Sequence, residues 1–172
     1  KRGIEAIGVD IDEMDITDAT SVDTVIKGAN PDAVIHCAAY TAVDKAEDEQ
    51  EICSKINTDA SKNIAISCEK IGAKMIYVST DYVFGGDGEK PYEVDDRKNP
   101  QNVYGRTKLD GENNVLEFCS KAFVVRTSWV YGINGNNFVK TMRRLAETRT
   151  ELNVVADQIG SPTYTRDLAK LL

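Results

Sequence analysis

The fold is decided first by the stretch Ala33-Val34-Ile35-His36-Cys37, which lies between Asn30-Pro31 and Ala38-Ala39. A short apolar run bounded by turn residues is typical of a parallel strand that is covered on both faces. His36 is the only histidine in the chain, and its place inside this run predicts a core or supporting position rather than a catalytic one.

Strand-length apolar runs and helical periodicity alternate outward from this strand in both directions. Helices are predicted at Asp18–Lys27, Asp44–Ile71 (in one piece or two), Asn102–Ser120, Asn136–Thr148 and Arg166–Leu172. Further strands are predicted at Glu5–Val9, Lys74–Val78, Ala122–Thr127 and Glu151–Val155. This order predicts an α/β protein with a doubly wound parallel sheet of the Rossmann type, since the units are too few to close a barrel. Residues 85–101 lack periodicity and indicate a functional loop or a misassigned element.

The composition narrows the class of protein. The chain has 172 residues, 41% of them hydrophobic, and a net charge of −7, which disfavours nucleic acid and anionic membranes as partners. The four cysteines are scattered without metal-ligand spacing, so we expect no metal site and a reducing, cytoplasmic location. Residue 1 is Lys and the chain stops within a predicted helix, so we expect a segment of a longer protein, truncated at both ends.

Tyr104 and Lys108 lie four residues apart in a predicted helix, a spacing that places both on one face. A neighbouring cation favours a phenolate, so we expect Lys108 to lower the pKa of Tyr104 and allow proton transfer near neutrality. Thr80 follows a predicted strand and could donate a hydrogen bond to a substrate oxygen. The alternatives are a surface tyrosine packed on a lysine stem and a threonine that only caps a turn.

Several stretches together carry a family resemblance. They are Ser79-Thr80-Asp81-Tyr82-Val83-Phe84, Asn102-Val103-Tyr104-Gly105-Arg106-Thr107-Lys108, Cys37-Ala38-Ala39-Tyr40-Thr41-Ala42-Val43-Asp44, Arg126-Thr127-Ser128-Trp129-Val130-Tyr131-Gly132 and Asp157-Gln158-Ile159-Gly160-Ser161-Pro162-Thr163. In this order they resemble the extended short-chain dehydrogenase/reductase superfamily, and within it the dTDP-4-dehydrorhamnose reductase family.

The resemblance implies hydride transfer from NADH or NADPH to C4 of dTDP-4-dehydro-β-L-rhamnose, giving dTDP-L-rhamnose. It implies a catalytic set of Thr80, Tyr104 and Lys108. Implied cofactor contacts are Asp10, Asp15, Ile16, Ala38, Ala39, Tyr40, Asn57, Tyr104 and Lys108. Implied substrate contacts are Thr80, Asp81, Tyr82, Tyr104, Trp129 and Gln158. Asn57 as an ordinary polar helix residue and Trp129 as plain core remain open alternatives.

One position separates related activities. Sugar-nucleotide dehydratases of the superfamily carry Asp-Glu after the active-site threonine, whereas Asp81 is followed here by Tyr82, which argues against dehydration. A nucleotide-sugar epimerase and a non-catalytic regulatory relative remain as alternatives. The partner implied is the nucleotide sugar, and a homodimer is one candidate assembly.

The binding parts of the family are only partly present. Asp10 closes a predicted strand, where a carboxylate would accept hydrogen bonds from a ribose 2′-hydroxyl, which favours NADH slightly. No GxxGxxG turn occurs, so the N-terminal pyrophosphate site is expected to be missing. The resemblance also implies a C-terminal part beyond Leu172 that completes the sugar-nucleotide pocket, and without both parts we expect the chain alone to be inactive. We therefore predict a partial dinucleotide-binding domain at residues 1–155 and the start of a sugar-nucleotide-binding part at residues 156–172.

Overall fold

The structure, a computed structural model, describes residues 3–172. The chain divides after Arg126 into two compact units, and each is described by itself. The predicted boundary after residue 155 separates a cofactor-binding part from a sugar-nucleotide-binding part. It is a division by ligand and not by compactness, and it stays a prediction. None of the helices between residues 3 and 172 is both long and apolar enough to span a bilayer.

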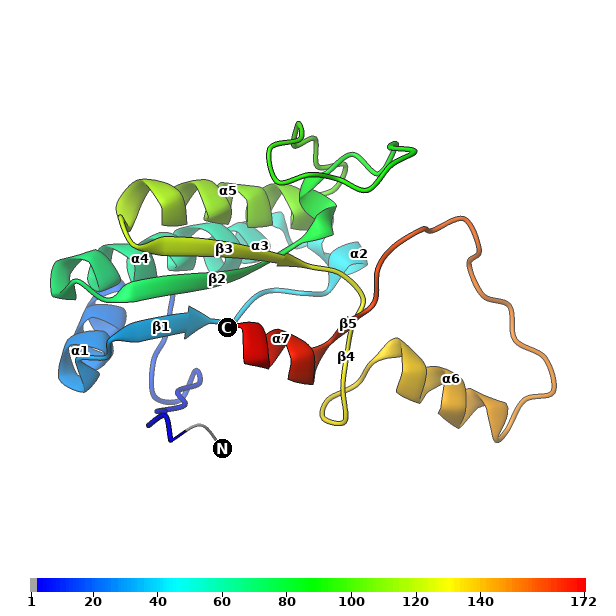
Figure 1. The fold of residues 1–172 in the computed structure, drawn as a ribbon, viewed down its shortest axis with the longest axis horizontal. Coiled ribbons are helices and arrows are strands. Elements are labelled where there is room, and N and C mark those ends of the chain that lie inside the picture. Colours follow the sequence, from blue (N-terminus) through cyan, green and yellow to red (C-terminus); the bar gives the residue numbers. More distant parts are fainter. Residues whose placement is uncertain (1–2) are drawn as a thin grey trace. The chain divides into compact units, whose positions relative to one another are not determined.

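The first unit is built on a three-stranded sheet. Strands β1 (Ala33–His36), β2 (Lys74–Thr80) and β3 (Ala122–Thr127) lie in the order β1-β2-β3, and their arrows point the same way in Figure 1. β1 and β2 are parallel, with Ala33 opposite Lys74 and His36 opposite Tyr77. The predicted parallel α/β architecture of the Rossmann type is confirmed, and β2 extends two residues further than expected.

Three helices build the main core of the first unit. They are α1 (Ala19–Ala29), α4 (Ala60–Ile71) and α5 (Val103–Phe118). α4 and α5 pack against the sheet, and α1 packs against α4. Apolar side chains from all three helices meet β2 in one cluster, and its largest fully buried members are Val22, Ile64, Met75, Tyr77 and Val115. This packing fixes the position of α5 over β2, the strand that ends at Thr80.

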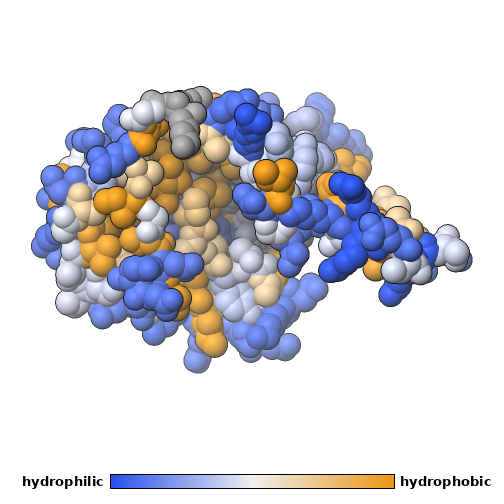
Figure 2. Space-filling view, turned by 90° about the horizontal axis from the view of Figure 1, so that it is seen from below, coloured by the Kyte–Doolittle hydropathy of each residue, from blue (hydrophilic) through white to orange (hydrophobic). Residues whose placement is uncertain are grey.

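The opposite face of the sheet is open. Ile35 on β1 is 48% exposed and Phe123 on β3 is 58% exposed, while the helix-covered side of β2 is fully buried. Apolar side chains gather on the surface of the first unit in Figure 2. The expectation that residues 33–37 are covered on both faces is therefore wrong for this chain, because the helices that contact β1 and β2 lie on one side.

The segment predicted as one or two helices over residues 44–71 forms several pieces. α2 (Val43–Ala46) is separated by a turn from α3 (Gln50–Ser54), which continues through a π-helical turn, η1 (Lys55–Asp59), into α4. α4 ends at Gly72, which has a φ of 72°. A π turn contains one residue more than the corresponding α turn and is frequent at functional sites. Here it includes Asn57.

Gly111 lets α5 approach this π turn and β2 closely. A Cβ at Gly111 would lie 2.4 Å from the Tyr77 hydroxyl and 2.5 Å from the Asn57 carbonyl oxygen. We expect Gly111→Ala to lower the free energy of unfolding by about 1–3 kcal/mol, the usual cost of overpacking. Chemical denaturation of the full-length protein measures this loss.

The matched control for Gly111→Ala is Gly28→Ala. Gly28 lies inside α1, and a Cβ there would have no neighbour within 4 Å. Alanine favours a helix interior over glycine, so we expect this variant to gain about 0.5–1 kcal/mol. Equal effects of the two substitutions would show that the close approach at Gly111 does not hold.

The second unit contains two short strands and two helices. β4 (Val130–Tyr131) pairs in parallel with β5 (Thr163–Tyr164), and the helices are α6 (Phe138–Ala146) and α7 (Thr165–Leu171). The two helices confirm the predictions for residues 136–148 and 166–172 within a few residues. The predicted strand at residues 151–155 is wrong, since these residues have no regular structure.

The predicted strand at residues 5–9 is also wrong. These residues are exposed and form no strand, although the segment is rich in apolar residues. A strand is stable only when a neighbouring strand satisfies its backbone groups. Within residues 3–172 the sheet holds only β1, β2 and β3, so this segment has no pairing partner there.

Candidate active site

The first turn of α5 is fixed by two side chains that bind its free backbone amides. Asn102 caps the helix by accepting a hydrogen bond from the Gly105 amide at 2.7 Å, and Glu47 accepts one from the Val103 amide at 2.8 Å. A Cβ at Gly105 would lie 2.2 Å from the Tyr82 carbonyl oxygen, so this turn contacts the backbone after β2 directly. Tyr104 is thereby held beside the end of β2.

Thr80 is the last residue of β2 and is buried. Its hydroxyl donates to the Asp81 carboxylate at 3.1 Å and accepts from the Tyr82 amide at 3.2 Å, which caps the short 3₁₀ helix η2 (Asp81–Val83). The Tyr104 side chain lies beside it, and Thr80 is one of the groups that act on the pKa of Tyr104. The capping role considered from the sequence is therefore present, and it coexists with contact to Tyr104.

The pKa of Tyr104 is raised above its ordinary value. Burial is the main cause, and the charges of Asp81, Tyr82 and Cys53 add to it, while the hydrogen bond with Thr80 acts in the opposite direction. The expectation that Lys108 lowers this pKa is wrong for this structure. The hydroxyl of Tyr104 therefore keeps its proton at neutral pH, which suits a group that donates a proton to a developing alkoxide.

Lys108 lies one turn further along α5 and is 2% exposed. Its ammonium donates to the Val78 carbonyl oxygen at 2.8 Å and lies 4.0 Å from the centroid of the Tyr77 ring. Burial lowers its pKa to about 8, against the opposing charge of Glu112. The surface-lysine alternative is excluded by this burial.

Tyr82 and Asp81 flank the predicted catalytic threonine. The ring of Tyr82 meets that of Tyr104 edge to face, with centroids 5.6 Å apart, and Tyr82 is 38% exposed. Burial raises the pKa of Asp81, and the hydrogen bond from Thr80 opposes this. Four of the predicted substrate contacts (Thr80, Asp81, Tyr82 and Tyr104) thus lie together.

Asn57 holds the loop after β1. Its side-chain oxygen accepts from the Tyr40 amide at 2.8 Å, and its side-chain nitrogen donates to the Tyr40 carbonyl oxygen at 3.2 Å. The same nitrogen donates to the Thr107 hydroxyl at 3.1 Å, next to Lys108 on α5. Asn57 is 1% exposed, so its side chain holds the Tyr40 backbone and Thr107 instead of facing solvent.

The loop held in this way carries the predicted cofactor contacts Ala38, Ala39 and Tyr40. Ala38 is exposed and Ala39 and Tyr40 are half-buried, so small side chains leave the backbone at the carboxyl end of β1 accessible. The Tyr40 hydroxyl donates to Glu49 at 2.6 Å, and this bond is the main cause that raises its pKa to about 12. The edge of a parallel sheet at the carboxyl ends of its strands is where ligands bind in folds of this class.

The other predicted cofactor contacts lie before α1. The Asp10 carboxylate accepts from the Ile11 amide at 2.8 Å, and Asp15 accepts from the Thr17 amide and hydroxyl at 2.9 and 2.7 Å. The Thr17 bonds are the main cause that lowers the pKa of Asp15. The Ile16 carbonyl oxygen accepts from Asn63 on α4. The bonds of the two carboxylates are local, and Asp10 closes no strand, so the basis for preferring NADH is lost.

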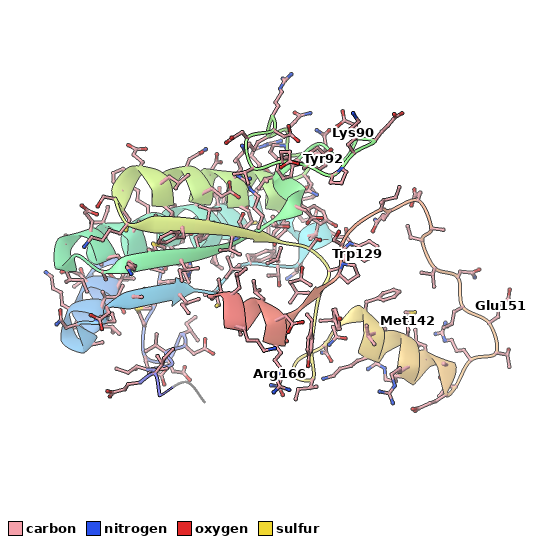
Figure 3. The ribbon with its side chains drawn as sticks, viewed as in Figure 1. Lys90, Tyr92, Trp129, Met142, Glu151 and Arg166 are labelled. Carbon is pink, nitrogen blue, oxygen red and sulfur yellow. The ribbon has the colours of Figure 1, made fainter. Side chains whose placement is uncertain are left out.

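Two predicted substrate contacts belong to the second unit. Trp129, labelled in Figure 3, is 48% exposed and has a φ of 47°, a conformation that is unusual for a bulky residue. A Cβ at Gly160 would lie 2.9 Å from the indole, so the ring packs on the Gly160 backbone. The alternative of Trp129 as plain core is therefore wrong. Gln158 is exposed in a segment without regular structure.

His36 takes the core position predicted for it. It is 4% exposed, lies 3.2 Å from the Ser61 hydroxyl through Nε2, and contacts the Tyr77 ring. Burial, with a smaller effect of the Lys108 charge, lowers its pKa to about 3 and keeps it neutral. Among residues 3–172, no group of three or more His, Cys, Asp or Glu side chains is placed to hold a metal ion.

The sequence interpretation missed a buried carboxylate. Glu112 lies one turn after Lys108 and accepts hydrogen bonds from Ser79 and Arg126. The spacing of four residues from Lys108 was a usable signal, because residues i and i+4 share a helix face. The two partners come from β2 and β3 and could not be paired with Glu112 from the sequence.

Comparison with known proteins identifies the family. A family model described as "RmlD substrate binding domain" matches residues 1–172. The chain belongs to the RmlD substrate binding domain family. The resemblance to dTDP-4-dehydrorhamnose reductases drawn from the motifs is confirmed by relatives of that name at 42–51% identity.

Among these relatives is the dTDP-4-dehydrorhamnose reductase of Mycolicibacterium smegmatis, 51% identical over 99% of this chain and 52% of its own length. A dTDP-4-dehydrorhamnose reductase structure from Clostridium acetobutylicum is 46% identical with a TM-score of 0.96, over 99% of this chain and 60% of that one. The Bacillus anthracis dTDP-4-dehydrorhamnose reductase, in complex with NADP, is 48% identical with a TM-score of 0.93, over 95% and 58%. The RmlD-family chain thus spans about half the length of the curated relatives that it matches.

Proposed function

We propose that the protein containing these residues reduces the C4 ketone of dTDP-4-dehydro-β-L-rhamnose to the alcohol, giving dTDP-L-rhamnose, with NADH or NADPH as the hydride donor. The observation that carries this proposal is the contact of Thr80 with Tyr104 at the end of β2, one helical turn from the buried ammonium of Lys108. The names of the relatives support the substrate and product.

The roles follow from the geometry. Tyr104 keeps its proton because burial raises its pKa, so it protonates the oxygen as the carbonyl accepts hydride. Thr80, beside Tyr104 at the end of β2, orients the same oxygen by donating a hydrogen bond to it. Lys108, one turn further along α5, would hold the cofactor beside Tyr104, as the family resemblance implies. The carbonyl gains one hydride on carbon and one proton on oxygen, which balances the reduction.

The described residues fit a nicotinamide cofactor. A reduced nicotinamide supplies the hydride when bound. The accessible backbone of Ala38 and Ala39, the Tyr40 backbone held by Asn57, and Lys108 would line its binding position. The Bacillus anthracis relative was solved with NADP. We therefore propose both NADH and NADPH as donors, without the preference for NADH drawn from Asp10.

Two other functions are tested against this proposal. A nucleotide-sugar epimerase would use a similar tyrosine and lysine but leaves the cofactor unchanged overall. A regulatory relative has no chemical need for the contact between Thr80 and Tyr104. We also propose a cytoplasmic location and a nucleotide-sugar partner, and a homodimer is the assembly to be tested by light scattering.

The test is the loss of near-ultraviolet absorbance of NADH or NADPH when the full-length protein is mixed with dTDP-4-dehydrorhamnose. The 172-residue chain is assayed beside it. Turnover by the full-length protein supports the reductase. Cofactor binding without net oxidation would favour the epimerase or the regulatory relative.

The pH dependence of kcat/KM should show the buried lysine. The pKa of Lys108 is lowered from 10.5 to about 8, chiefly by burial, so its ammonium is lost as the pH rises through about 8. We expect kcat/KM of the full-length enzyme to fall above that pH, since this parameter reports the ionisation of the free enzyme. A profile that stays flat up to pH 10.5 would contradict the role of the ammonium.

A further inference from the structure

Glu112 is a buried carboxylate that the proposed reaction does not use. It is 2% exposed. One of its oxygens accepts from the Ser79 hydroxyl at 2.6 Å and from Nε of Arg126 at 2.9 Å, and the other accepts from a terminal nitrogen of Arg126 at 2.7 Å. A buried charge is costly unless it is paired and hydrogen-bonded. Glu112 meets both conditions, so its carboxylate can stay ionised at this depth.

Glu112 connects the two elements that carry the proposed catalytic groups. Glu112 lies four residues after Lys108 on α5, so the two share a helix face. Ser79 directly precedes Thr80 on β2. One carboxylate thus links the helix that carries Lys108 and Tyr104 with the strand that ends at Thr80.

Arg126 extends this link to the loop of residues 85–101. Its second terminal nitrogen donates to the Val94 carbonyl oxygen at 3.1 Å, and its guanidinium lies 5.2 Å from the centroid of the Phe84 ring. Phe84 in turn stacks on Tyr92, with ring centroids 4.4 Å apart. Figure 3 labels Tyr92 on this loop. The loop that follows η2 is therefore tied to Glu112 through a single guanidinium.

We propose that Glu112 is a positioning residue for the reduction: through Ser79 and Arg126 it holds α5, Thr80 and the 85–101 loop in one arrangement, and its carboxylate supplies a negative charge one helical turn from Lys108. This inference rests on the proposed function.

The electrostatics of the site agree with this assignment. Burial lowers the pKa of Lys108, and Glu112 is the largest opposing influence. The titratable groups that interact with Lys108 come from several elements, namely His36 and Cys37 at the end of β1, Cys53 of α3, Tyr77 of β2 and Glu112 of α5. The cysteines add smaller effects in the same direction as Glu112, and His36 is neutral.

The experiment compares Glu112→Gln with wild type in the full-length enzyme, through the pH profile of kcat/KM. Glutamine keeps the shape and removes the charge, so we expect the basic limb to move to lower pH by roughly half a unit to one unit. Glu117→Gln is the matched control, because Glu117 is exposed on the same helix, and its profile should coincide with wild type. An unmoved limb in folded Glu112→Gln would overturn the electrostatic part of the proposal.

A second variant keeps the charge and changes the geometry. In Glu112→Asp we expect the basic limb of wild type with a lower kcat and little change in KM, since the shorter side chain cannot hold Ser79 and Arg126 together. A wild-type kcat in Glu112→Asp would overturn the positioning role, even if Glu112→Gln does not fold.

A readout without substrate separates this inference from the proposed function. NMR titration of lysine labelled with ¹³C at Cε, assigned with Lys108→Met, reports the ionisation of Lys108 directly. A downward shift of its titration in Glu112→Gln would support the electrostatic link even if dTDP-4-dehydrorhamnose is not reduced. An unshifted titration would overturn that link even if the enzyme is active.

Discussion

Replacing Tyr104 by phenylalanine in the full-length protein is expected to lower kcat by roughly a hundredfold or more, the usual size of an acid–base contribution. The substitution removes the hydroxyl that contacts Thr80 and keeps the ring that packs edge to face on Tyr82. Cofactor affinity should therefore change little. Steady-state kinetics with dTDP-4-dehydrorhamnose, together with fluorescence titration of NADPH, measure both quantities.

The control for this variant is Tyr92→Phe. Tyr92 also loses a hydroxyl that is hydrogen-bonded, to the Gly88 amide at 3.1 Å, but in the 85–101 loop rather than at the end of β2. We expect its kcat to stay at the wild-type value. Near-wild-type turnover of Tyr104→Phe would rule out the proton-donor role of Tyr104, and an equal loss in both variants would point to a general effect of the loop.

The largest loss of stability is expected from Arg126→Met. This change leaves the Glu112 carboxylate, which is 2% exposed, without its bidentate partner. Removal of one member of a buried ion pair costs about 3–5 kcal/mol, because the remaining charge stays desolvated. Urea denaturation of the full-length protein, followed by circular dichroism, measures the free energy of unfolding.

Two further variants make this result specific. Lys70→Met breaks the Lys70–Asp23 ion pair, whose side chains are 50% and 25% exposed, and should have little effect because exposed pairs contribute little. The double variant Glu112→Gln with Arg126→Met should regain part of the lost stability, since no unpaired buried charge remains. If Arg126→Met lowers the free energy of unfolding no more than Lys70→Met does, the buried Glu112–Arg126 ion pair does not stabilise the fold as described.

The elements that carry the site could be predicted because their signals are local. β2 has an apolar run, α5 begins after an asparagine cap, and Tyr104 and Lys108 lie at i and i+4 on it. These features depend on neighbours within a few residues along the chain. The same is true of the loop at residues 38–40, which follows directly from the end of β1.

The failures concern properties that depend on distant parts of the chain. The segment at residues 5–9 has a strand pattern, but pairing needs a neighbouring strand. The pKa of Tyr104 rises because of burial, which the spacing to Lys108 does not reveal. The Glu112 network joins residues 14 and 33 positions apart, and only the folded sheet brings them together.

The π turn at Lys55–Asp59 also escaped prediction, and it changes what one helical segment can do. The turn acts as a phase shift of one residue, and one residue corresponds to about 100° of rotation in an α-helix. After the turn, Ile64 and Cys68 face the core, while Cys53 before the turn and Asn57 within it face α5, and Asn57 also binds the Tyr40 backbone. Deleting a residue from the turn would regularise the helix, and it would turn one of these two faces away from its partner.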